Sequence, residues 1–448
     1  MKNSLETSAT KIKDRLQRNN IKEFEVYLLQ KNGTNVAFKS HIKDLLELKE
    51  ACGFALRIIN KQKMGFSFGV AFSDEDIDRV IQQAVNAMSY TTQDSFHKFI
   101  EKQEMSSENC FADPCFSETT LQEKIEILTN MQAKILAFDP KIKEVSQAIF
   151  EDEKQTIQIV NSNGYDEVQE RTLFSLSAAV LAQNNDKKEI AYLTQAKMFM
   201  DQIDYSKLAQ LVALDAIGYL GGGPIKSYEG PVILRNNVVA QLIKNLSPSF
   251  WANQIATHKS CLTDKMGKKI YSDKVTIIDN GHYEQGRCGR KFDDEGMPTQ
   301  ETVLVHKGVV TGLLYDFYWA NKLGEKSTGN AHRESLSAKP EIHNTDLFIK
   351  PCDNSLDDLI EAMNSGIIVS NVIGMHTTNK ITGELSVGIQ GHVVHNGQKQ
   401  QAIRQMVMTG NIHEIMKNVQ IVGSDLNFFA PYGGVSLLID PLKISGTY

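Results

Sequence analysis

The sequence has none of the features of a membrane-spanning, secreted or nucleic-acid-binding protein. Its 448 residues include no apolar run near the roughly 18 that a spanning helix needs. The N-terminal segment MKNSLETSATKIKDRLQRNN alternates in charge and lacks the apolar stretch of a secretion signal. The net charge of -6 argues against a phosphate-binding surface, because nonspecific affinity for nucleic acid comes from clustered Lys and Arg. We therefore expect a cytoplasmic protein that binds neither membranes nor nucleic acid.

Cysteine is also scarce. The six cysteines, at positions 52, 110, 115, 261, 288 and 352, are too few for a disulfide framework at this length, and no two form a C-x-x-C pair. Cys110 and Cys115 flank the segment FADP and are close in sequence. Free thiols are nevertheless the favoured interpretation, because the expected compartment is reducing.

The composition is that of a globular protein with more than one domain. Hydrophobic residues make up 41% and charged residues 23%, and the length exceeds what one core usually supports. Alternating apolar residues over 24–72 predict paired antiparallel strands. Apolar stripes after Ser73 and after Thr120 predict two helices, each opened by a capping residue. Residues 143–200 then have the pattern of a β-meander with a turn at Asn163-Gly164.

The pattern changes after the run Gly221-Gly222-Gly223, which ends a predicted helix over 208–220 and is typical of a linker. Beyond it, short strands alternate with turn residues, and Asn280-Gly281 and Asn396-Gly397 predict hairpins. The expected fold class is α+β, with an N-terminal α+β region of antiparallel strands and helices followed by a β-rich C-terminal domain. The expected domains are 1–90 (α+β), 110–222 (helix and β-meander) and 226–448 (β-rich), with a polar stretch over 91–116.

Some short motifs suggest catalytic chemistry, but each has a simpler interpretation. Gly65-Phe-Ser-Phe-Gly69 matches the G-x-S-x-G elbow of serine hydrolases, yet the apolar alternation continues through Ser67 as in one strand. His413 precedes Glu414 without a second His at the spacing that a zinc-binding helix needs, so an exposed helix face is favoured. His392 and His395 point to opposite faces if they lie in a strand, which favours structural or exposed roles.

The triplet Asp293-Asp294-Glu295 leaves more than one interpretation open. Clustered carboxylates are ligands for a hard cation such as Mg²⁺. Acidic runs beside glycine are more often exposed turns. A third interpretation, a role in a peptide groove or an interface, depends on the longer motif to which the triplet belongs.

That motif and two others carry a resemblance to a known family. Phe292–Gln300 reads FDDEGMPTQ, Ser327–Arg333 reads STGNAHR and Thr382–Gly388 reads TGELSVG. These blocks resemble the TldD/PmbA family of zinc-dependent peptidases, and the resemblance covers nearly the whole chain. Catalytic TldD-type members carry a His-Glu-x-x-x-His helix and a C-terminal Cys ligand. Here the matching segments are NNVVAQLIKN (Asn236–Asn245) and NFFA (Asn427–Ala430).

Neither segment offers the His, Cys, Asp or Glu that zinc requires. The sequence is therefore most similar to the PmbA (TldE) branch, the non-metal partner of TldD that was historically named a modulator of DNA gyrase. The resemblance implies no catalytic residue, no metal and no cofactor in this chain, with zinc expected only in a TldD-like partner that performs the hydrolysis. It also implies that residues 226–448 form a metalloprotease-like domain.

The resemblance further implies that the chain completes a substrate chamber and binds unfolded peptides. The alternative is a non-enzymatic homodimeric peptide-binding module that acts without a catalytic partner, and a third possibility is a hydrolase that uses Ser67. Seven residues in the family's motifs are the candidates for substrate binding or for an interface: Asp293, Asp294, Glu295, Thr299, Gln300, Asn330 and Arg333.

Overall fold

The computed structural model describes residues 2–40, 42–102 and 110–446, so residues 103–109 of the predicted polar stretch lie outside the described residues. No helix among these described residues is long and apolar enough to cross a membrane. The helices are α1 (Lys2–Arg18), α2 (Asp74–Ala87), α3 (Leu121–Phe138), α4 (Tyr205–Gly218), α5 (Asn236–Leu246), α6 (Ala252–Ala256), α7 (Phe317–Leu323), α8 (Leu356–Met363) and α9 (Ile412–Lys417).

The N-terminal half is built on one antiparallel sheet of long strands. Its strands are β1 (Glu23–Lys39), β2 (Ile42–Asn60), β3 (Lys63–Gly69), β4 (Ile142–Asn161), β5 (Asp166–Asn184) and β6 (Lys187–Lys197), in the order β3-β2-β1-β4-β5-β6. Because β1 pairs with β4, residues 1–90 and 110–222 share this sheet although the sequence patterns treat them as separate domains. Pairing between segments so far apart in the chain leaves no local signal in the sequence.

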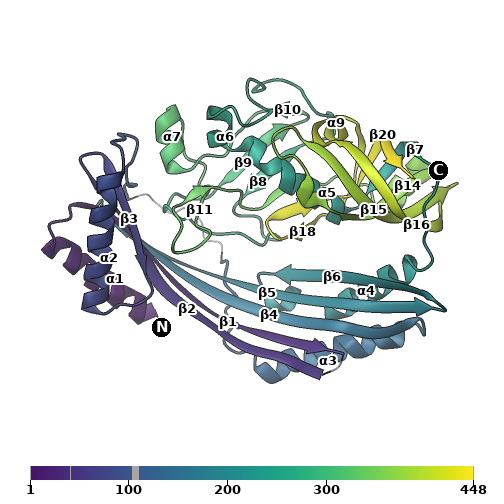
Figure 1. Cartoon of the computed structure of the whole chain (residues 1–448), viewed down its shortest axis with the longest axis horizontal. Helices are drawn as coiled ribbons and strands as arrows, with labels where there is room; N and C mark the ends of the chain where they lie inside the picture. The colour runs from purple at the N-terminus through teal and green to yellow at the C-terminus, as the bar shows by residue number, and fades with distance from the viewer. Residues whose placement is uncertain (1, 41, 103–109, 447–448) are drawn as a thin grey trace.

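The two faces of this sheet have different partners, as the period of two in a strand requires. Val26 and Leu28 of β1 and Leu56 of β2 pack against α1 and α2, and farther along the sheet Phe150 and Phe174 lie in a core with α3 and α4. The alternate residues face the C-terminal half of the chain: Tyr27, Leu29, Ala55, Ile157 and Ile159 cluster with Phe292. Figure 1 shows the sheet curving beneath the C-terminal half.

The C-terminal half is rich in short strands. One six-stranded sheet has the order β10-β9-β8-β13-β19-β18, another has the order β16-β15-β14-β7-β20-β17, and β11 pairs with β12. Their bounds are β7 (Tyr228–Leu234), β8 (Ile277–Asn280), β9 (Glu301–His306), β10 (Val309–Val310), β11 (Ala331–His332), β12 (Glu341–Ile342), β13 (Leu347–Ile349), β14 (Gly366–Ile373), β15 (Glu384–His395), β16 (Gln398–Asn411), β17 (Val419–Val422), β18 (Asn427–Phe429), β19 (Tyr432–Gly434) and β20 (Leu437–Ser445).

The largest core combines α5 with residues from both of these sheets. The α+β class and the β-rich C-terminal region are therefore confirmed. The predicted capping residues are confirmed as well, since the side chains of Ser73 and Thr120 accept hydrogen bonds from the backbone of the helices that they open.

Two of the three predicted hairpin turns are present. Asn163-Gly164 lies between β4 and β5, and Asn396-Gly397 joins β15 to β16 with positive φ at both residues, 50° and 71°. Asn280-Gly281 is not a hairpin, although β8 pairs with β9. The Asn280 side chain accepts a hydrogen bond from the backbone of His282 at 2.8 Å and so opens a long loop, residues 281–300. That loop carries the FDDEGMPTQ block.

Candidate functional site

Helix α5 is the segment in which the resemblance places the zinc-binding helix of TldD-type proteins. Its apolar side, which includes Val239 and Leu242, is fully buried. Its amide side chains hold it to neighbouring main chain. Asn236 donates to the Asp425 carbonyl at 3.0 Å, and Asn237 donates to the Ser370 carbonyl at 2.9 Å. The helix is thus fixed by packing and by amide hydrogen bonds.

The second segment of that comparison, Asn427–Ala430, lies beside α5. Strand β18 pairs with β19, which packs so closely on the helix that a Cβ atom on Gly434 would lie 1.9 Å from the Asn236 carbonyl oxygen. Apart from Lys244, the side chains of both segments are amide, aromatic or aliphatic, and neither these nor an ammonium group fits zinc, which takes thiolate, imidazole or carboxylate ligands. Among the described residues, no group of three or more His, Cys, Asp or Glu lies together as a metal site. That the protein holds no zinc stays a prediction.

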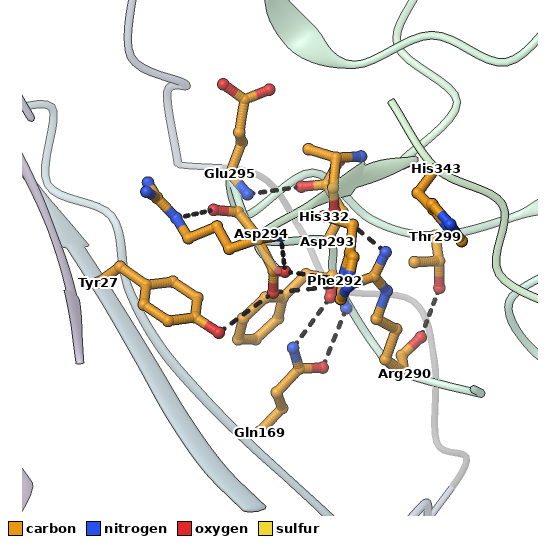
Figure 2. Close-up of polar contacts among 12 residues, drawn as sticks. Tyr27, Gln169, Arg290, Phe292, Asp293, Asp294, Glu295, Thr299, His332 and His343 are labelled. Atoms are coloured by element: carbon orange, nitrogen blue, oxygen red, sulfur yellow. Dashed lines mark hydrogen bonds and ion pairs between the residues drawn. The ribbon is translucent and has the colours of Figure 1, made fainter. Parts of the chain in front are cut away.

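The acidic triplet lies at the contact between the two halves, where Figure 2 shows it against residues of the N-terminal sheet. Asp293, Asp294 and Glu295 are 0%, 2% and 3% exposed, so the exposed-turn interpretation is wrong. The reason is that loop 281–300 crosses the sheet. Gln169 of β5 donates to the Phe292 carbonyl at 2.9 Å, and the Phe292 ring meets Tyr165 edge-on with centroids 6.2 Å apart.

Asp294 is held as a carboxylate by several donors. Its Oδ2 accepts from the backbone N–H of Arg333 at 2.7 Å and lies 3.2 Å from His332 Nδ1, while Oδ1 accepts from the Tyr27 hydroxyl at 3.4 Å. Burial alone would raise the pKa of Asp294, but the His332 hydrogen bond and the charge of Arg290 outweigh it and hold the pKa well below its usual range. This side chain therefore anchors the loop as a permanent anion.

The pKa of Asp293 is shifted in the opposite direction from that of Asp294. Its Oδ1 accepts from the backbone N–H groups of Glu295 and Met297, both at 2.9 Å, and its Oδ2 accepts from the backbone of Ala331 at 2.9 Å. Burial and then the charge of Glu295 raise the pKa of Asp293 to about 7. Both oxygens are thus occupied by main chain, so this carboxyl group shapes the loop and has no free side for a ligand.

Glu295 extends into a chain of buried ion pairs between the halves. Arg57 of β2 donates from Nη1 to Glu295 at 2.7 Å and from Nη2 to Glu25 of β1 at 2.6 Å. Arg333 then donates to the other oxygen of Glu25 at 2.9 Å. Charge-assisted hydrogen bonds of this kind are strong when every partner is present, and removal of one partner leaves a buried charge uncompensated. The motif residues are therefore part of an interface inside the chain.

The structure brings only some of the other candidate residues to this contact. Arg333 belongs to it, whereas Thr299 donates to the Arg290 carbonyl at the base of the same loop. Asn330 is 1% exposed and donates to Asp279 at 2.7 Å, which fixes the segment before β11 to β8. Gln300 is exposed and donates to Thr302 at 3.3 Å. These residues position the loop, and Gln300 lies outside the buried network.

The N-terminal partners, Glu25 and Arg57, were not among the residues predicted from the sequence. Each is a charged residue inside an apolar strand pattern, Phe24-Glu-Val-Tyr-Leu and Phe54-Ala-Leu-Arg-Ile-Ile. A charge at a position where both strand faces are apolar indicates a buried ion pair. That signal could have identified both residues, but it could not have paired them with Glu295 or Arg333.

Beside the ion pairs lies a cavity of about 380 Å³. The N-terminal half contributes Arg57 and His97 to its wall, and the C-terminal half contributes Asn253, Asp316 and Trp319. Asp316 is 4% exposed and accepts from the Trp319 backbone at 2.7 Å, which caps α7. Burial and then the charge of Glu295 raise the pKa of Asp316 to about 8. A second cavity, near Tyr27 and Arg290, measures about 20 Å³ and has room for one water molecule.

The histidines of the sequence analysis have defined contacts. His413 is in a helix as predicted, but the prediction of an exposed face is wrong, because its ring lies 2.8 Å from Cys261 Sγ and 2.8 Å from the Tyr271 hydroxyl. His392 is partly buried and bonds the Gly218 carbonyl at 3.0 Å. His395 is exposed.

Ser67 lies in the continuous strand β3, as the alternation predicts, and donates to Gln83 at 2.9 Å. The side-chain partner of Ser67 among the described residues is thus an amide, which cannot act as the base that a nucleophilic serine needs. The six cysteines are free.

Comparison with known proteins places these features in a family. Three family models match in order along the chain: PmbA/TldA metallopeptidase domain 1 at residues 24–87, the central domain at 115–217 and the C-terminal domain at 227–446. An uncharacterized protein of Methanocaldococcus jannaschii, MJ0231, is 30% identical over 88% of this chain and 90% of its own length. Metalloprotease PmbA of Escherichia coli O157:H7 is 24% identical over 94% of this chain and 92% of its own length.

The relatives also include a metalloprotease TldD homolog from Buchnera aphidicola, so proteins of the TldD kind as well as the PmbA kind are similar to this chain. Among solved structures, TldE from Thermococcus kodakarensis superposes with a TM-score of 0.89, covering 96% of this chain and 98% of its own. At 19% identity this match shows that the fold is shared.

Proposed function

We propose, because this chain belongs to the PmbA/TldD family, that it is the non-metal subunit of a two-chain peptidase. In this proposal a TldD-like partner holds the zinc and hydrolyses the peptide bond. This chain completes the chamber and helps to bind unfolded peptides. It contributes binding and shape, and no side chain of it takes part in the chemical step.

The observation that carries the proposal is the state of α5 and β18. The two segments that would carry metal ligands lie side by side and keep tight packing, yet both hold side chains that do not fit zinc. The packing supports the alignment of the two segments with the TldD type, since a chance alignment would not place them together. A structural partner of an active homologue needs the shared fold, but it does not need the metal ligands.

An exposed edge of the N-terminal sheet offers a surface for the partner. Strand β3 pairs with β2 only from Phe54 to Asn60, so on that side residues 44–52 of β2 have no neighbour among the described strands. This stretch carries Leu45, Leu46 and Leu48, which are 41%, 41% and 74% exposed. An unpaired edge strand with exposed leucines is a template for pairing with another chain, even though charged residues alternate with the leucines here. The exposed edge of β2 therefore supports the proposal of a complex with a second subunit.

The test is co-expression with a TldD-like chain from the same source. We expect the two chains to co-purify and to hydrolyse an unstructured peptide, and we expect a chelator to abolish turnover. The double variant Leu46→Lys/Leu48→Lys should weaken association at least about tenfold, because two charges would then enter an apolar contact. The control variant is Leu211→Lys on α4, which changes a leucine that is also 41% exposed but lies away from the edge.

Three results would contradict the proposal. Full peptidase activity in this chain without a partner would show that it has chemistry of its own. Loss of that activity in Ser67→Ala would identify the hydrolase alternative. A stable homodimer that excludes every TldD-like chain, with the β2 edge at its interface, would favour the homodimeric binding module.

A further inference from the structure

The cavity of about 380 Å³ is a feature of the interface that the ion pairs leave unexplained. Its volume is within the range of small-molecule sites, at the low end. Its wall comes from both halves of the chain, with His97 before α3 and Asn253 in α6. A site of this kind accepts one end of an extended molecule, and its polar groups determine which end.

The charges around the cavity would not balance if every buried carboxyl group were ionised. The buried acidic groups of the contact are Glu25, Asp293, Asp294, Glu295 and Asp316, and the buried basic groups are Arg57, Arg290 and Arg333. The carboxyl groups therefore outnumber the guanidinium groups. Lys339, the other cationic side chain of the wall, is exposed and has no ion pair among the described residues. With all five carboxyl groups ionised, the buried contact would be short of positive charge, and the pKa values of Asp293 and Asp316 are raised accordingly.

Asp316 is the place where a cation fits. Asp293, the other carboxyl group whose pKa is raised, is closed by three backbone donors. Asp316 lines the cavity, and its Oδ1 accepts from the Trp319 backbone, whereas no described donor reaches its Oδ2. Burial disfavours the charged form of Asp316. A positive group in the cavity would compensate for this effect and allow the carboxyl group to ionise.

The other polar side chains of the wall include donors as well as acceptors. Asn253 Oδ1 and His97 Nδ1 are buried and have no hydrogen-bond partner within the described structure. Burial lowers the pKa of His97, so its ring is neutral and can accept. An ammonium group has three donors and no acceptor, and Asp316, Asn253 and His97 are wall residues that each have an unpartnered acceptor atom within the described structure. The ring of Trp319 lines the same wall, and the Lys322 ammonium group already lies over this ring, 5.0 Å from its centroid.

We propose that this cavity binds a protonated primary amine, with Asp316 as its counter-ion and Asn253 as a further acceptor. If the chain is the peptide-binding subunit described above, on which this part of the inference rests, the amine is the α-ammonium group of a peptide. The chain would then select peptides by a free N-terminus and orient them in the chamber. A lysine side chain or a small diamine has the same chemistry and is the competing source.

Calorimetric titration of the isolated full-length chain tests the inference without the partner. The probes are trialanine amide with a free N-terminus, the same peptide N-acetylated, and putrescine. We expect the free peptide to bind and acetylation to weaken binding at least about tenfold, because the ammonium group is lost. Binding of putrescine but of neither peptide would keep the amine site and overturn its assignment to peptides. No difference between free and acetylated peptide would overturn the site itself.

The variant Asp316→Asn separates binding from folding. Because burial already keeps the Asp316 carboxyl group neutral, the amide should cap α7 and fold as well as the native residue. It cannot become an anion, so affinity for the free peptide should fall at least about tenfold. The matched control is Glu341→Gln, at an exposed acidic residue of the same wall.

Unchanged affinity in Asp316→Asn, or an equal loss in Glu341→Gln, would refute the role of Asp316. Because these titrations need no second subunit, they can fail while the two-chain peptidase is still active, and they can succeed while it is not. Thermal unfolding of both variants confirms that each is folded before its affinity is compared.

Discussion

Two regions of this molecule contain the segments that characterise its family. They differ in whether close packing or charged side chains are present. Around α5 and β18 the packing remains close, but the residues offer no thiolate, imidazole or carboxylate for a metal. In the loop of residues 281–300 the charges remain buried, and Glu295 forms an ion pair with Arg57 of the N-terminal sheet. The first region preserves a shape without chemistry, whereas the second uses charge to hold the two halves together.

The difference shows that a conspicuous motif need not be a reacting site. Asp293, Asp294 and Glu295 resemble catalytic or metal-binding carboxylates in sequence, but their oxygens are occupied by backbone N–H groups and by arginines. The feature with room for a ligand is the cavity next to them, where Asp316 has a free oxygen. Occupancy of the polar atoms, more than residue type, separates the two roles.

The largest predicted effect tests the structural role of the ion pairs. Arg57→Met should lower the free energy of unfolding by about 3–5 kcal/mol, because Glu25 and Glu295 would lose their shared cation while still buried. Urea denaturation with the slope compared between proteins measures this change. If the two halves unfold separately, the loss of stability should appear in the unfolding transition that occurs at the lower urea concentration.

The matched control is Arg79→Met in α2. Arg79 lies 2.6 Å from Asp76, about as close as Arg57 lies to Glu295 at 2.7 Å, but the Arg79 side chain is 61% exposed. The control should change stability by less than about 1 kcal/mol, since exposed pairs are screened by water. Equal effects from the two substitutions would contradict the view that the buried network joins the halves.

A smaller effect concerns pH. The pKa values of Asp293 and Asp316 are raised to about 7 and about 8, so the folded protein holds protons there that the unfolded chain releases near its ordinary value of 3.8. Their contribution to stability is thus complete below pH 3.8 and is lost as pH rises towards 8. Asp316→Asn removes one of these groups. Between pH 6.5 and 9 the variant should lose less stability than the native protein, by on the order of 1 kcal/mol.

Denaturant titrations at several pH values check this difference. Glu295, Arg57 and Asp293 are the charged groups that act on Asp316, and they are present in both proteins. Identical pH profiles for the native protein and Asp316→Asn would mean that Asp316 is ionised in the folded state. The positive groups around the cavity would then already be sufficient to keep Asp316 ionised without a ligand.

The fold was largely predictable from local patterns. Period-two alternation identified the long strands, and Ser73, Thr120 and Asn396-Gly397 marked helix starts and a hairpin through side chains that act on the adjacent backbone. The pairing of β1 with β4 was not predictable, because no local pattern encodes a contact between residues so far apart in the chain. The same limit explains the error at Asn280-Gly281, where the turn residues open a loop that a distant sheet holds in place.

The candidate site was predicted only in part. The motif residues were identified, but their exposure was misjudged, since a run such as Asp293-Asp294-Glu295 is buried only if arginines arrive from other segments. Arg57 and Glu25 were visible as charges in apolar strands, whereas Asp316 carries no signal in its own surroundings. Its importance comes from the cavity, which exists only after the two halves meet.

The smallest expected effect concerns the region that has lost its ligands. The isolated protein should retain far less than one zinc per chain after dialysis, and added zinc should not shift its unfolding temperature, because a ligand stabilises only a folded state that binds it. Metal analysis and thermal unfolding measure both quantities, with a TldD-like chain purified in parallel as the control. About one zinc per chain, held through dialysis and lost in a variant of α5 or β18, would contradict the comparison drawn between the two regions. Amides such as Asn237 and Gln241 would then have to act as metal ligands, although Asn237 already donates to the Ser370 carbonyl.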